Sequence, residues 1–149
     1  MVLALYILIN IIYPTDNIDS VRMYNNYIDK AIKNYCFLDI EYDITNNVNS
    51  DLILYPSINI LNEEVLGFVT SSYLVNPKIS GIPKIYISNK LQRETDIVQI
   101  LTHELGHFLG LDHSIDENSL MYPYYYYTVY NLSRQDTLLL KRIYNLPQK

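Results

Sequence analysis

All three histidines of this chain fall in one segment, HELGHFLGLDH, at residues 103–113. His103 and His107 are four residues apart, so on an α-helix they lie about 40° apart around the axis and one turn apart along it. Their imidazoles would therefore point in the same direction, with Glu104 beside them. A continuous helix would turn His113 away from the other two histidines. The spacing therefore predicts a helix that ends between His107 and His113.

Gly110 is suited to end this helix, because a residue without a Cβ adopts the left-handed conformation at no steric cost. The chain could then turn back so that His113 supplies a third nitrogen. Three protein ligands with one open coordination position are typical of a catalytic zinc site rather than a structural one. The sequence therefore predicts one zinc ion held by His103, His107 and His113. HExxH alone is a weak pattern, but the longer HExxHxxGxxH pattern rarely arises by chance.

Composition narrows the alternatives. The chain has 149 residues, of which 49% are hydrophobic and 18% charged, so it is predicted to form one domain with a substantial core rather than a disordered chain. Its net charge of −5 argues against a nucleic-acid partner. No apolar run reaches the roughly 18 residues of a transmembrane segment. The apolar start lacks the flanks of a signal peptide and is predicted to be a strand. Localisation stays open on the sequence alone.

The single cysteine, Cys36, excludes an intramolecular disulfide and a cysteine-based structural zinc site. It could be a thiolate ligand or a nucleophile, but a small residue of the core is the favoured interpretation.

The periodicity predicts an α+β order of elements. A buried strand over residues 3–13 precedes a helix capped by Thr15 or Asp16. Further strands are expected at 38–44, 52–55, 65–70 and 84–88, and further helices at 93–109 and 133–144, the last capped by Ser133. The expected inward positions of the first helix are Ile18, Val21, Tyr24, Ile28, Ala31, Ile32 and Tyr35, and those of the last helix include Leu138, Leu139 and Ile143.

The sequence resembles the metzincin clan of zinc endopeptidases, in which this long motif is followed by a methionine turn. Met121, within Ser-Leu-Met-Tyr-Pro at 119–123, stands at the position of that methionine. Within the clan the sequence is most similar to the matrixins. Ser114 directly follows the third histidine, as is usual in matrixins. Residues 113–123 match the matrixin stretch nearly throughout, 132–136 resemble the start of its last helix, and 50–54 resemble its third strand.

The resemblance implies a twisted, mostly parallel five-stranded sheet with three helices, the active-site helix being followed by the methionine turn. It implies a single metalloprotease catalytic domain over 1–149 that hydrolyses internal peptide bonds of proteins, with Glu104 as general base and Met121 beneath the zinc ligands. It also implies an extracellular location, and a monomer is expected. The residues expected to form the substrate pocket are Gln99, Pro123 and Tyr125, with Leu66 and Gly67 on a strand that pairs with extended substrate.

The sequence also departs from the matrixin pattern. No propeptide cysteine and no haemopexin-like domain is recognisable. The loop that carries a second zinc and calcium in matrixins shrinks to about 57–64, and no histidine is left over for it. One zinc is therefore expected, and calcium could be bound only weakly, through backbone carbonyls and scattered aspartates. Pro123 occupies the place of the zinc-approaching tyrosine of astacins and serralysins.

Two other classes of function stay open. One is a catalytically silent, zinc-containing protein-binding module, although such a module has no need of Glu104. The other is a zinc-dependent inhibitor or toxin-like effector that acts by occlusion. The tyrosines at 124–127 and 130 could bind carbohydrate or protein, but a wall of the substrate pocket is the favoured interpretation.

Overall fold

The computed structural model describes residues 7–14, 17–45, 50–125 and 128–148. They form a five-stranded sheet in the order β2-β1-β3-β5-β4. Its strands are β1 (Ile7–Ile12), β2 (Ile40–Ile44), β3 (Leu52–Ile58), β4 (Gly67–Val69) and β5 (Lys84–Ser88). Four of them run parallel, and β4 pairs antiparallel with β5 at the edge of the sheet. This confirms the predicted mostly parallel sheet. Residues 3–6 of the predicted first strand lie outside the described residues.

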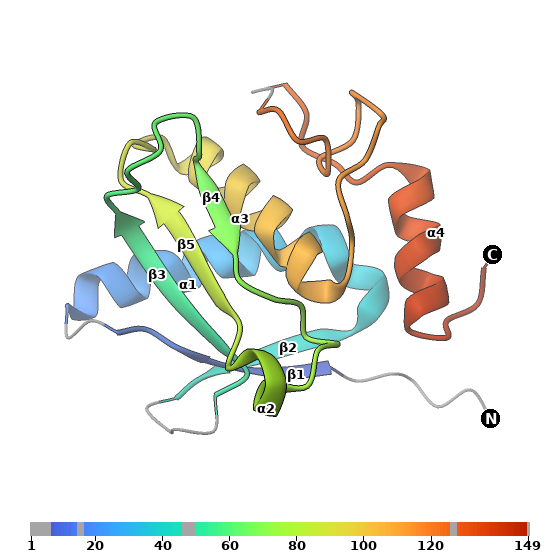
Figure 1. The fold of residues 1–149 in the computed structure, drawn as a ribbon, viewed down its shortest axis with the longest axis horizontal. Coiled ribbons are helices and arrows are strands. Elements are labelled where there is room, and N and C mark those ends of the chain that lie inside the picture. Colours follow the sequence, from blue (N-terminus) through green and yellow to red (C-terminus); the bar gives the residue numbers. More distant parts are fainter. Residues whose placement is uncertain (1–6, 15–16, 46–49, 126–127, 149) are drawn as a thin grey trace.

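Two long helices, α1 (Ile18–Ile32) and α3 (Glu94–Leu109), pack against each other and cover one face of the sheet (Figure 1). A third helix, α4 (Arg134–Ile143), lies beside the end of α3, and the chain between them forms an extended loop (Figure 1). The core between sheet and helices is apolar. Its fully buried side chains include Ile9, Ile11, Leu54, Ile85 and Ile87 from the strands and Ile28, Leu101 and Phe108 from the helices. None of the described helices is long and apolar enough to cross a membrane.

The helix caps agree only in part with the prediction. Ser133 caps α4 as expected, and it forms a capping box in which its side chain accepts from the Asp136 N–H while the Asp136 carboxylate accepts from the Ser133 N–H. The predicted cap of α1 by Thr15 or Asp16 is wrong. Asn17 is the cap, because its side-chain oxygen accepts from the N–H groups of the second and third residues after it.

The prediction that Cys36 is a core residue is also wrong, since its side chain is exposed. After α1 the chain tightens into a 3₁₀ helix, η1 (Lys33–Leu38). With three residues per turn, Tyr35 and Leu38 lie on the same face, and both are buried. Of the two residues between them, Cys36 faces outward, whereas Phe37 is partly buried.

Two apolar residues assigned to buried helix faces are exposed. Ile18 is the first residue of α1 and is 72% exposed, because the helix begins beyond the edge of the core. Leu139 in α4 is 39% exposed, whereas Leu140 turns inward and is fully buried. A short helix that the sequence did not predict, α2 (Pro77–Ser80), precedes β5 and is capped by the side chain of Asn76.

Candidate active site

The helix α3 ends where the sequence predicts. Gly110 has a φ of 111°, in the left-handed region, and its N–H bonds to carbonyls of the last turn. The next N–H, of Leu111, donates to the Gly106 carbonyl at 2.9 Å. A Cβ at Gly110 would lie 2.7 Å from the Cδ1 of Leu74, but that side chain is exposed and can move, so the backbone conformation is what selects glycine here. The chain then turns back toward α3 and delivers His113.

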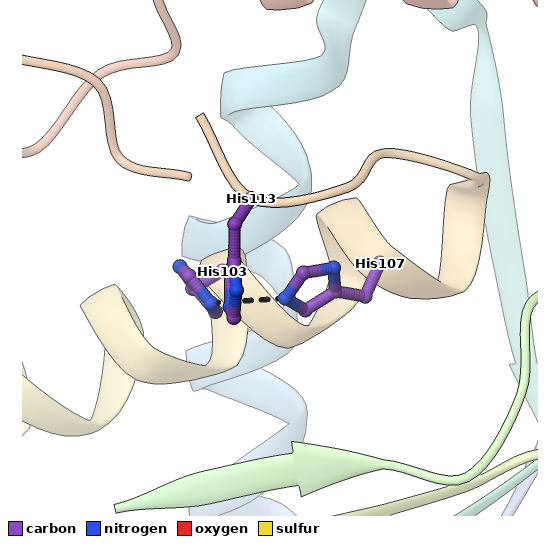
Figure 2. A group of neighbouring side chains, drawn as sticks. All are labelled: His103, His107 and His113. Carbon is purple, nitrogen blue, oxygen red and sulfur yellow. Dashed lines mark hydrogen bonds between the residues drawn. The ribbon is translucent and has the colours of Figure 1, made fainter. Parts of the chain in front are cut away.

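The three histidines converge on one point. His103 and His107 project from neighbouring turns of α3, and His113 reaches them from the loop that follows (Figure 2). One nitrogen from each of the three rings lies within 4.8 Å of the others. The rings of His103 and His107 are oriented through their Nδ1 atoms, each 2.7 Å from a backbone carbonyl, of Leu120 and Leu111 respectively. This arrangement leaves both Nε2 atoms free to act as ligands.

The donor set fits a zinc ion. The Nε2 atoms of His103 and His107 are 3.1 Å apart, close to the roughly 3.3 Å expected for two imidazoles on one tetrahedral zinc. Burial lowers the pKa of His103 to about 4 and also lowers that of His107, so both rings are neutral at pH 7. With each Nδ1–H directed at a carbonyl, two lone pairs face each other. A cation bound between the two Nε2 atoms would remove that repulsion.

Glu104 lies beside this cluster but is not part of it. Its side chain is only 5% exposed, and burial raises the pKa of its carboxyl to about 8. A nearby divalent cation acts in the opposite direction and favours the carboxylate. The carboxyl faces β4 across a narrow gap, since a Cβ at Gly67 would lie 3.2 Å from the Oε1 of Glu104 and 2.7 Å from the Cγ2 of Ile100. Gly67 therefore permits the edge strand to approach α3 closely.

A cavity of about 610 Å³ opens in front of the histidines and Glu104. One wall comes from β4 and the residues before it, and the opposite wall comes from the loop between α3 and α4. All residues that the sequence assigned to the substrate pocket line this cavity: Leu66, Gly67, Gln99, Pro123 and Tyr125. The structure therefore brings together residues from three distant parts of the chain. Of the tyrosine run, Tyr124 also lines the cavity, whereas residues 126 and 127 lie outside the described part.

Two side chains of the pocket are held by specific contacts. Gln99 is buried, and its side-chain amide donates to the carbonyl of Val129. The hydroxyl of Tyr125 donates to Asp96 at 2.6 Å, and Asp96 is itself held by two bonds from the Arg93 guanidinium at 2.7 and 2.8 Å. The loop wall is thus tied to the first turn of α3, which limits how far it can move from the histidines.

Met121 is fully buried and packs against Gly106 of the histidine-bearing helix. Its sulfur and methyl group fill the space beside Gly106, and the hydroxyl of Tyr35, from η1, lies against the same space. Tyr35 also donates a hydrogen bond of 2.5 Å to the Thr102 carbonyl within α3. Neither the packing at Gly106 nor this bond is predicted from the sequence. A glycine inside a helix is itself a signal, since it costs about 1 kcal/mol relative to alanine unless packing requires it.

The described residues form a mostly parallel five-stranded sheet covered by helices, which is the α+β fold of the metzincins. The family model described as matrixin, peptidase family M10, matches residues 24–145. Because this match covers most of the chain, the protein belongs to the matrixin family.

Individual relatives are similar over shorter stretches. Matrix metalloproteinase-16 of Homo sapiens is 32% identical over an alignment of 92 positions, and the match covers 56% of this chain and 15% of that protein. Macrophage metalloelastase of Oryctolagus cuniculus is 32% identical over 89 residues, 56% of this chain and 19% of the relative. Karilysin of Tannerella forsythia is 38% identical over 52 residues, and the match covers 35% of this chain and 11% of karilysin. The matched stretches thus span less than a fifth of these relatives.

Proposed function

We propose that this protein is a zinc-dependent endopeptidase that hydrolyses internal peptide bonds of protein or peptide substrates. The observation that carries the proposal is the convergence of three imidazole nitrogens within 4.8 Å of one another, beside the buried carboxyl of Glu104, at the floor of an open cleft. His103, His107 and His113 are the ligands, and Glu104 is the general base. Membership of a family whose named relatives include metalloproteinases supports the same conclusion.

Zinc, when bound, supplies the positive charge that makes a coordinated water acidic near neutral pH and polarises a substrate carbonyl. The chain's own residues orient the metal ligands and transfer the proton. His103 and His107 hold their rings through bonds from Nδ1 to backbone carbonyls, so that little reorganisation accompanies metal binding. Glu104 accepts the proton of the attacking water at its carboxylate and then gives it to the leaving amine.

The edge strand β4 is the proposed binding site for the substrate backbone. It is the last strand in the sheet order, and residues 64–69 form one side of the cleft. An extended peptide can add to such an edge as a further antiparallel strand through its main-chain groups. Recognition of this kind reads the backbone rather than a particular sequence, which suits an enzyme that cleaves exposed or unfolded segments of proteins.

Side-chain specificity is proposed to come from the pocket between Gln99 and the loop wall. Pro123 and Tyr125 line the cavity on the loop side, and Gln99 lines it from α3. The rings of the two wall residues are apolar, and Gln99 is proposed to limit the depth of the pocket. We therefore expect a preference for a medium or large apolar residue directly after the cleaved bond. A cleavage map in which charged residues dominate at that position would contradict this specificity.

The test of the function is the isosteric change Glu104→Gln, which removes the proton acceptor and keeps the shape. Zinc content and fold should be retained, and turnover of a peptide substrate should fall by the general-base contribution, a factor of roughly 10² to 10⁴. Glu117→Gln, at an exposed residue of the neighbouring loop, is the matched control and should keep its activity. Full zinc with unchanged hydrolysis in Glu104→Gln would refute the role of Glu104. A wild-type protein that binds zinc without cleaving any peptide would instead indicate a catalytically silent binding module.

A further inference from the structure

One peptide group in the methionine turn is held at both of its polar atoms. The carbonyl of Leu120 lies 2.7 Å from the Nδ1 of His103, which donates to it. The N–H of the same peptide group belongs to Met121 and donates at 3.0 Å to the hydroxyl oxygen of Ser119. This peptide group therefore connects the ring of one histidine to the side chain of Ser119.

The hydroxyl of Ser119 continues the connection to a carboxylate. Having accepted from the Met121 N–H, it donates its own proton to the Oδ2 of Asp136 in the first turn of α4. Both side chains are nearly sealed from solvent, with Ser119 2% and Asp136 6% exposed. Four groups thus form one chain of hydrogen bonds that all run in the same sense: His103 at one end, the 120–121 peptide, Ser119, and the carboxylate at the other end.

We propose that Ser119 and Asp136 are positioning residues of the metal centre, acting on His103 through the peptide group between Leu120 and Met121. The proposal rests on the function proposed above, since it assigns these residues to the zinc ligand set. Hydrogen bonds in series polarise one another, and a buried carboxylate at the end of the series strengthens each acceptor along it. The Leu120 carbonyl then holds the Nδ1–H of His103 more firmly, which fixes the ring and makes its Nε2 a better ligand.

Asp136 also takes part in the cap of α4, and this contact can be separated experimentally from the path to His103. It also accepts from the hydroxyl of Ser133 at 2.6 Å as part of the capping box of α4. Ser133 and Ser119 therefore bond to the same carboxylate oxygen, but only Ser119 bonds to the peptide that holds His103. Replacing either serine removes one bond to the Asp136 carboxylate, and Ser133→Ala also removes the bond from the Asp136 N–H. Only Ser119→Ala interrupts the path to the histidine.

The experiment compares Ser119→Ala with Ser133→Ala in the full chain. Zinc affinity is measured by competition with a chromogenic chelator, and the melting temperature of the zinc-free protein is measured in parallel. Ser119→Ala should raise the zinc dissociation constant about tenfold, the lower end of the range for partners that orient metal ligands. Ser133→Ala should lower the melting temperature of the zinc-free protein through the lost cap, and leave the zinc dissociation constant within about twofold of wild type.

An unchanged zinc dissociation constant in Ser119→Ala would overturn the proposal. Equal losses of zinc affinity in both variants would overturn it as well, since they would show a general effect of loosening α4. Should Ser119→Ala fail to fold, Asp136→Asn carries the test, because it removes the charge and retains an oxygen for both hydroxyls. A weaker zinc affinity than in Ser133→Ala supports the proposal, and an equal one contradicts it. Failure of the wild-type protein to bind zinc would refute the proposed function itself, which is a distinguishable result.

Discussion

The sulfur of Met121 occupies the space that a side chain at Gly106 would need. A Cβ at Gly106 would also lie 2.9 Å from the hydroxyl of Tyr35, and both neighbours are fully buried. Gly106 lies in α3 between His103 and His107, so the methionine packs directly beneath the turn that carries the proposed ligands. Because residue 106 has no Cβ, the methionine can approach this turn of the helix closely.

Gly106→Ala should therefore destabilise the protein, although alanine is the better helix former by about 1 kcal/mol. Overpacking a tight core site costs about 1–3 kcal/mol, and we expect a net loss in the free energy of unfolding of the zinc-free protein. The measurement is denaturant unfolding followed by circular dichroism. In a double-mutant cycle, Gly106→Ala should cost less free energy of unfolding in the Met121→Ala background than in the wild-type protein. A stabilised Gly106→Ala protein would show that Met121 packs elsewhere.

The proposed ligands should differ in how much they contribute to the stability of the zinc-free protein. His113 is exposed, so His113→Ala should change the stability of the zinc-free protein by less than about 0.5 kcal/mol. His103→Ala should cost about 1 kcal/mol or more, because the buried Leu120 carbonyl loses its donor. Both variants should lose zinc affinity, since three nitrogens are reduced to two. Retention of wild-type zinc affinity by either variant would remove that residue from the ligand set.

Elemental analysis of the untagged protein should find one zinc ion per chain. Among the described residues, His103, His107 and His113 form the one group of three or more side chains that could hold a metal ion. The loop after β3 has no histidine to contribute to a second site. Removing zinc with a chelator should abolish hydrolysis, and one equivalent of zinc should restore it. Two tightly held zinc ions in a monomer would refute this count.

Gln99 should control the length of side chain that the pocket accepts. Its amide bonds to the Val129 carbonyl, and behind it lies a second, smaller pocket of about 160 Å³ that Gln99 also lines. Gln99→Leu frees the side chain from this bond, and Gln99→Ala removes most of it. Relative cleavage of substrates with long over short apolar residues after the cleaved bond should rise severalfold in the first variant and about tenfold in the second. An unchanged preference in both would place Gln99 outside the pocket.

The elements of this protein could be predicted from sequence where the governing interactions are local. The ends of α3 follow from the spacing of His103 and His107 and from Gly110, because helical periodicity and the left-handed conformation of glycine act over a few residues. The cap of α4 by Ser133 follows in the same way. Even the convergence of the three histidines is mostly local, since all of them lie within one helix and the turn that ends it.

The tertiary structure decided the contacts between segments that are distant in the sequence. The outward position of Cys36 depends on η1, which buries Tyr35 and Leu38 in the core; the periodicity predicted the inward position of Tyr35 but not the exposure of Cys36. The space that Met121 fills at Gly106 likewise exists only once the loop has folded back under α3.

The connection from Asp136 to His103 joins α4 to α3 through the methionine turn, and a one-dimensional pattern contains no information on such a path. The sequence by itself therefore determined which residues could bind a metal. Packing decided how firmly they are held, because steric fit and hydrogen bonding between buried groups depend on three-dimensional proximity rather than on spacing along the chain.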